Sequence, residues 1–102
     1  MIKHIVMFKL KDTPEHTAAE NAAIAKAEAE KLRTAVPSLK EYEVVLNADN
    51  ADNSNYNIAL ICLFGDMAGL AEYQQHPAHK EFGEFIYGLR TENGRACIDF
   101  EI

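Results

Sequence analysis

Hydrophobic side chains fall on both faces of a period-two pattern between residues 2 and 11. One face of the predicted strand carries Ile2, His4, Val6, Phe8 and Leu10. The opposite face carries Ile5 and Met7, so it is hydrophobic in the middle as well. This pattern is typical of a strand that is covered on both sides. We therefore expect protein on both faces of the sheet that contains it.

A helical pattern follows this strand. Asp12, Thr13 and Pro14 form a helix-start signal, with a capping side chain followed by a proline. We expect a helix from this point to about Ala35, because Pro37 prevents the helix from continuing. Its buried stripe recurs at steps of three and four and consists of Ala18, Ala22, Ala25, Ala29, Leu32 and Val36. Because most of these side chains are small, the helix either lies close to its sheet or leaves a cavity beneath it.

The rest of the chain repeats the alternation of strands and helices. The predicted elements are strands over 40–48 and 56–64, a short helix capped by Asp66, a helix from Pro77 to about Leu89, a turn at 91–94 and a strand over 95–102. The loop 49–55 contains two aspartates, but the spacing of its oxygen-bearing side chains does not match a calcium-binding loop. We therefore expect a solvated loop.

This order of elements predicts one α+β domain over residues 1–102, a ferredoxin-like βαββαβ plait with an antiparallel four-stranded sheet. In that topology the helices cover one face of the sheet. Since the first and third strands are hydrophobic on both faces, we expect a second copy to cover the open face, which gives a homodimer and a dimeric α/β barrel. The first strand would separate Cys62 from Cys97, so no disulfide is expected.

Composition excludes several classes of function. The formal net charge of −6 argues against nucleic-acid partners and a basic membrane-binding face. No hydrophobic run approaches the roughly 20 residues that cross a bilayer. The first residues lack the features of a secretion signal, so we expect a cytoplasmic protein. No zinc spacing and no glycine-rich phosphate loop occurs, and no cofactor is predicted.

The segment Tyr73-Gln-Gln-His76-Pro77-Ala78-His79 holds the candidate chemistry. Histidine is the side chain that gains and loses a proton near neutrality. Pro77 suits the first position of a helix, so His76 is predicted at the helix start and His79 in its first turn. Both lie beside the positive end of that helix, a place suited to a neutral imidazole or an anionic ligand.

Three segments resemble the stress-responsive dimeric α/β-barrel (Dabb) family: residues 3–12, the Tyr73-x-x-His76-Pro77-x-His79 element followed by Phe82, and Ile98-Asp99-Phe100. The resemblance covers essentially the whole chain. It implies a ferredoxin-like protomer that pairs into a barrel-like dimer.

Plant members of that family include cofactor-free polyketide cyclases that perform an intramolecular aldol condensation. The resemblance implies that Tyr73 and His79 match their catalytic residues. His4 and His76 match two further histidines, and the implied cavity lies between the helices and the sheet.

The site supports three hypotheses. The first is cofactor-free lyase, cyclase or isomerase chemistry on a small apolar carbonyl compound, with His79 as the base, Tyr73 as the oxyanion donor, and ligand contacts from His4, His76 and Phe82. The second is a small-molecule-binding stress-response module without turnover, and the third is a purely structural dimer. The small alanine stripe departs from the bulky lining expected of a cyclase. Metal binding by His76 and His79 is disfavoured because Pro77 reorients His76 and no third ligand is evident.

Overall fold

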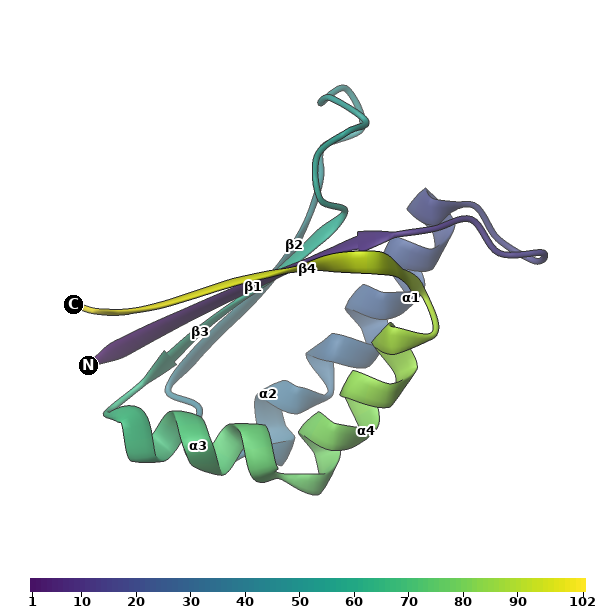
Figure 1. Cartoon of the computed structure of the whole chain (residues 1–102). Helices are drawn as coiled ribbons and strands as arrows, with labels where there is room; N and C mark the ends of the chain where they lie inside the picture. The colour runs from purple at the N-terminus through teal and green to yellow at the C-terminus, as the bar shows by residue number, and fades with distance from the viewer.

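An antiparallel four-stranded sheet carries all of the helices on one of its faces (Figure 1). The computed structural model describes residues 1–102. The elements are β1 (Ile2–Leu10), α1 (Ala18–Glu30), α2 (Leu32–Ala35), β2 (Glu41–Leu46), β3 (Ile58–Phe64), α3 (Met67–Gln75), α4 (Pro77–Tyr87) and β4 (Arg90–Glu101). The strand order is β2-β3-β1-β4, so the two strands that come from opposite ends of the chain are neighbours. This confirms the predicted ferredoxin-like α+β plait.

The start of the long helix differs from the prediction. α1 begins at Ala18, and Thr17 caps it by accepting a hydrogen bond from the backbone N–H of Glu20, while the Glu20 carboxylate accepts from the Thr17 N–H. This reciprocal capping box satisfies two backbone donors, so it determines the start in preference to the proline signal upstream. Asp12 still contributes, because its carboxylate accepts a hydrogen bond from the Ala18 N–H at 2.7 Å.

The predicted turn at 91–94 is wrong, since β4 already begins at Arg90 and runs through that segment. Phe8 pairs with Arg95 and Leu10 pairs with Arg90, so the register shifts between these two pairs and the extra residues of β4 form a bulge. Asn93 adopts a positive φ of 62° within it. A Cβ at Gly94 would come within 2.7 Å of the Lys9 carbonyl oxygen, and only glycine fits there.

The two faces of the sheet differ. Along β1 every second residue from Ile2 to Leu10 is buried beneath the helices, and the intervening residues are half-buried. The uncovered face carries hydrophobic side chains in register, with Ile5 opposite both Ile61 and Ile98. Ile98 is 60% exposed on this face.

Both cysteines are free, and β1 separates their strands as predicted. No helix has the length and hydrophobicity needed to cross a membrane.

The alanine stripe brings α1 close to the sheet and leaves no cavity beneath the helix. Ala25 and Ala29 are fully buried, and Ala22 is nearly so. The Tyr42 side chain reaches from β2 under the helix, where its hydroxyl donates a hydrogen bond to the Ala29 carbonyl at 2.8 Å. Of the two arrangements that the sequence left open, close packing is therefore the one that occurs.

We expect the Ala29→Leu substitution to destabilise the protein by about 1–3 kcal/mol, because the added side chain has no space between α1 and Tyr42. Ala27→Leu provides a matched control at an exposed position of the same helix, and we expect a change within about 0.5 kcal/mol. Urea denaturation followed by circular dichroism, at one fixed protein concentration, measures both variants. Equal stability of the two variants would contradict tight packing at Ala29.

Candidate functional site

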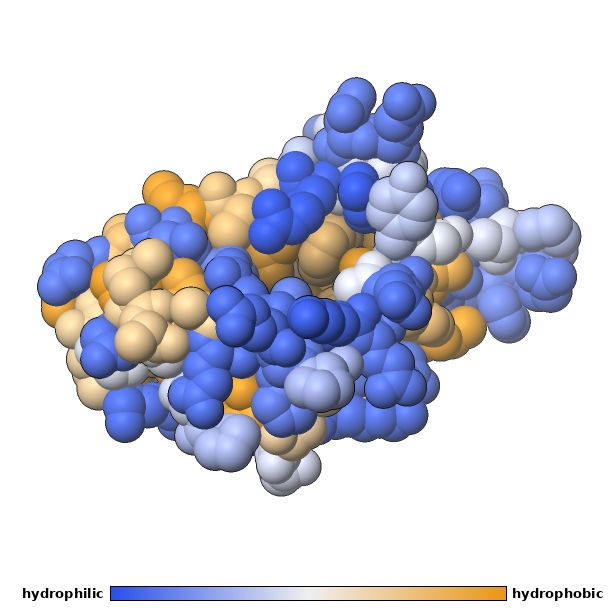
Figure 2. Space-filling view, turned by 60° about the horizontal axis from the view of Figure 1, so that its bottom comes forward, coloured by the Kyte–Doolittle hydropathy of each residue, from blue (hydrophilic) through white to orange (hydrophobic).

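A cavity of about 170 Å³ opens between α4 and the β1–β4 side of the sheet. Its hydrophobic lining comprises Val6, Phe8, Leu60, Phe82 and Ile86. Its polar lining includes His4, Tyr73, His79, Arg90 and Arg95. Figure 2 shows a hollow on this face, with hydrophobic surface inside it and hydrophilic side chains around it. The volume is smaller than the roughly 300 Å³ at which pockets for drug-sized ligands begin, so the cavity suits a small molecule.

The structure brings together most of the residues singled out from the sequence. Tyr73, His79, Phe82 and His4 all line this cavity. His76 does not line it, and its Nδ1 instead accepts a hydrogen bond from the Ala78 N–H at 3.0 Å. This confirms the predicted position of His76 at the start of α4. The alanine stripe of α1 takes no part in the lining.

His79 lies in the first turn of α4, with its ring centroid 4.5 Å from that of Tyr73. Burial lowers the pKa of His79, and the neighbouring His4 and Arg95 lower it further, whereas the backbone of Gln74 acts in the opposite direction. A lowered pKa favours the neutral imidazole near pH 7. His79 can therefore accept a proton from a ligand in the cavity.

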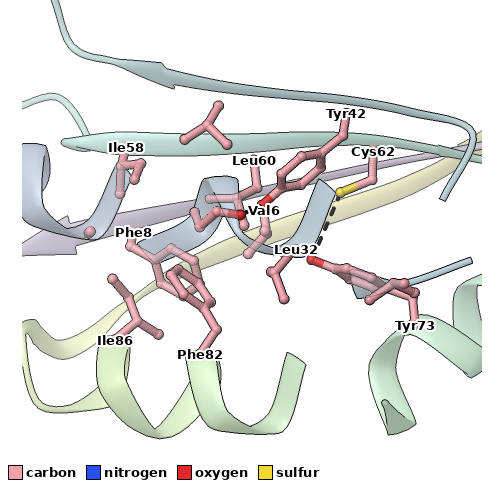
Figure 3. Close-up of a cluster of buried hydrophobic side chains, with 14 of the residues drawn as sticks. Val6, Phe8, Leu32, Tyr42, Ile58, Leu60, Cys62, Tyr73, Phe82 and Ile86 are labelled. Atoms are coloured by element: carbon pink, nitrogen blue, oxygen red, sulfur yellow. Dashed lines mark hydrogen bonds between the residues drawn. The ribbon is translucent and has the colours of Figure 1, made fainter. Parts of the chain in front are cut away.

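Tyr73 is fully buried and extends from α3 toward the sheet (Figure 3). Burial raises its pKa strongly, so the phenol stays protonated. Burial also raises the pKa of the Cys62 thiol, to about 12. The Tyr73 hydroxyl oxygen accepts a weak hydrogen bond from that thiol, with 4.0 Å between sulfur and oxygen. The Tyr73 hydroxyl makes no other hydrogen bond, and the residue lines the cavity.

His4 forms a pair with Asp99 that the sequence did not reveal. The two residues face each other across the β1–β4 ladder, and His4 Nδ1 is hydrogen-bonded to the Asp99 carboxylate. His4 is 2% exposed. This contact engages Nδ1 and leaves Nε2, the other ring nitrogen, free of Asp99. Only strand register shows this pairing, because the residues lie at opposite ends of the chain.

The metal-ligating atoms of His4, Cys97 and Asp99 lie within 4.8 Å of one another. The Cys97 Sγ is 3.5 Å from His4 Nδ1, the atom that Asp99 already contacts. Burial and the nearby Asp99 raise the pKa of Cys97, which favours the neutral thiol. The three side chains form a hydrogen-bonded group around His4 Nδ1.

Comparisons with known proteins agree with this architecture. The model of the family described as stress responsive A/B barrel domain (Dabb) matches residues 2–102. A dimeric protein of unknown function from Bacteroides fragilis NCTC 9343 is 30% identical, with a TM-score of 0.80 over 99% of this chain and 95% of that chain.

Two further solved structures are described as dimeric ferredoxin-like proteins of unknown function. The protein from Thermobifida fusca YX is 28% identical, with a TM-score of 0.76 over 99% of this chain and 90% of its own. The protein from Jannaschia sp. CCS1 is 25% identical, with a TM-score of 0.78 over 99% of this chain and 98% of its own. No curated protein sequence matches the chain.

Proposed function

This chain belongs to the stress responsive A/B barrel domain family, and from that premise we propose a homodimer whose pockets move a proton next to a carbonyl group without a cofactor. The observation that supports this most directly is the pairing of His79 with Tyr73 in one small cavity. One of these groups is held neutral and the other is held protonated, as a base and a hydrogen-bond donor require.

The proposed step is enolisation. A neutral nitrogen of His79 takes a proton from the carbon next to the carbonyl group, and the electrons of that C–H bond form the carbon–carbon double bond of an enolate. The negative charge moves to the carbonyl oxygen, which accepts a hydrogen bond from Tyr73. Return of the proton from His79 to a different carbon of the enolate completes an isomerase reaction. Attack of the enolate on a second carbonyl group forms a carbon–carbon bond, and transfer of the proton from His79 to the resulting alkoxide completes a cyclase reaction.

His4 and Asp99 are proposed to support this step. The Asp99 carboxylate fixes the orientation of the His4 ring, whose centroid lies 6.1 Å from that of Tyr73. A His4 ring that is oriented in this way can accept or return a proton in the same cavity as His79. The aldol chemistry implied by the resemblance to plant cyclases belongs to this reaction class.

Proteins of the same fold show that the architecture accommodates catalysis. A hydroxynitrile lyase from Passiflora edulis has a TM-score of 0.71 at 18% identity. A cofactor-independent oxygenase from Streptomyces nogalater has a TM-score of 0.71 at 12% identity. At these identities the likeness concerns the fold alone, so the proposal for this chain depends on its own side chains.

The homodimer is proposed from the open face of the sheet. Large hydrophobic side chains on this face remain exposed in one copy, notably Val45, Ile98 and Phe100. A monomer rarely leaves such a patch in water, and a second copy of the same sheet is complementary to it. The solved relatives described as dimeric support this arrangement.

Deuterium exchange tests the proposed chemistry without knowledge of the natural substrate. The wild-type protein is incubated in D₂O with 4-oxopentanoate, a small methyl ketone, and proton NMR follows the loss of signal at the carbons beside the carbonyl group. We expect exchange faster than in buffer alone, since enolisation is the proposed step. Binding of the ketone without faster exchange would instead favour the small-molecule-binding module without turnover.

A further inference from the structure

The cavity contains two arginines that no acidic side chain neutralises. The chain has three arginines, although its net charge is −6. Arg33 pairs with Glu30 at 2.8 Å. Arg90 and Arg95 line the cavity, and neither forms an ion pair with an acidic residue. The cavity therefore carries two positive side chains without ion-pair partners, although the protein as a whole is acidic.

The bulge in β4 is the reason that these arginines lie together. Five positions separate them along the chain, and in a regular strand an odd spacing places two side chains on opposite faces. Here Arg95 pairs with Phe8 and Arg90 pairs with Leu10, which are two positions apart on β1 and both face the helices. Arg90 and Arg95 are therefore neighbours on the same face. Bulges re-aim side chains in this way next to functional sites.

The neighbouring groups leave both arginines available to a ligand. The Arg90 guanidinium carbon stacks 5.0 Å from the centroid of the Tyr87 ring, and its Nη1 donates to the Thr91 carbonyl at 3.3 Å. These contacts use few of its five N–H donors. Neither arginine is ion-paired with an acid, since Asp99 is hydrogen-bonded to His4 and Glu92 makes no ion pair.

We infer that the cavity takes a small carbonyl compound that also carries a carboxylate, with Arg90 and Arg95 binding the carboxylate while the carbonyl group reaches Tyr73 and His79. This inference rests on the proposed function and names its class of substrate. A guanidinium presents parallel N–H donors that match the two oxygens of a carboxylate. The same positive charges stabilise the enolate that forms when His79 removes a proton. The hydrophobic lining accommodates the carbon chain between the two ends.

Two probes of the same shape test the inference. The first is 4-oxopentanoate, and the second is 5-methylhexan-2-one, in which an isopropyl group replaces the carboxylate. Binding of each probe to the wild-type protein is measured by calorimetry or by NMR titration. We expect 4-oxopentanoate to bind at least about tenfold more tightly, since a hydrogen bond to a charged group contributes roughly that factor. Added salt should weaken the binding of this probe and leave the neutral probe unaffected.

The variants Arg95→Gln and Arg90→Gln should each reduce the preference for the carboxylate by about tenfold. The matched control is Lys31→Gln, which removes one positive charge at an exposed position that pairs with Glu28. We expect this control to keep the preference of the wild type. Equal binding of the two probes, no measurable binding of either probe, or an unchanged preference in both arginine variants would overturn the inference.

Deuterium exchange separates this inference from the proposed function. A preference for the carboxylate that depends on the arginines, without faster exchange, supports the anion site and contradicts the proposed catalysis. Faster exchange of both probes to the same extent, with no preference in binding, supports the catalysis and contradicts the anion site.

Discussion

Replacing His79 with alanine is expected to slow the exchange of protons beside the carbonyl group by about 10²–10⁴-fold, the contribution typical of a positioned general base. The imidazole is the group proposed to hold the proton in this step, and its contact with Tyr73 places it beside the oxyanion donor. Binding of 4-oxopentanoate should weaken much less than the exchange rate falls, because the proposed carboxylate contacts come from the arginines. The measurement compares rates and dissociation constants of the two proteins in the same buffer.

His16→Ala is the matched control. His16 is an exposed histidine in the segment before α1, remote from the cavity, and its removal should leave the exchange rate unchanged. Exchange in the His79→Ala variant at the wild-type rate would remove His79 from the reaction. A variant that binds the ketone as the wild type does would at the same time show that its fold is intact.

The pH dependence of the exchange rate and of the stability has a defined sign. Burial lowers the pKa of His79 below its ordinary value of 6.5, so the neutral base persists to a lower pH than it would in water. The exchange rate should therefore stay level near neutrality and fall only below pH 6.5. The free energy of unfolding depends on pH for the same reason. In the unfolded chain His79 binds a proton more readily than in the native state, so the native state loses stability as the pH decreases below 6.5. In the His79→Ala variant this part of the pH dependence should be absent.

The hydrophobic pattern predicted the order of elements because each strand and helix carries its own periodicity. Residues 2–10 alternate so regularly that both the buried face and the open face follow from the sequence. Boundaries were less predictable where two local signals compete. The proline signal at Pro14 and the capping box at Thr17 both indicate a helix start, and only the hydrogen bonds show that Thr17 determines it.

The local sequence pattern predicted only those residues of the candidate site that lie in the single segment 73–79. Tyr73 and His79 lie six residues apart, so proline position and helix geometry were enough to bring them together. Arg95 reaches the cavity, and Asp99 reaches His4, through the register of β4 on β1, which no local pattern reveals. The sequence of the bulge at 91–94 resembles a turn, because asparagine followed by glycine favours positive φ in either structure. A turn at that point gives no reason to place Arg90 and Arg95 on one face.

Replacing Ile98 with aspartate is expected to convert the proposed homodimer into a monomer. Ile98 lies on the open face, in register with Ile5 and Ile61, and is 60% exposed in one copy. In the dimer this position is covered, and an unpaired carboxylate there costs several kcal/mol in each of the two copies. The dissociation constant should therefore rise by about 10³-fold or more. Sedimentation velocity over a series of protein concentrations measures this change.

Ile24→Asp makes the same substitution on the outer surface of α1, where the side chain is 37% exposed, and this control should remain dimeric. Because the cavity lies on the helix-covered face, the Ile98→Asp monomer should keep its circular dichroism spectrum and still bind 4-oxopentanoate, provided that one copy folds on its own. A dimer of unchanged affinity in the Ile98→Asp variant would show that the copies associate through another surface. The open sheet face would then need a different covering, since its hydrophobic residues are too numerous for a face turned to water.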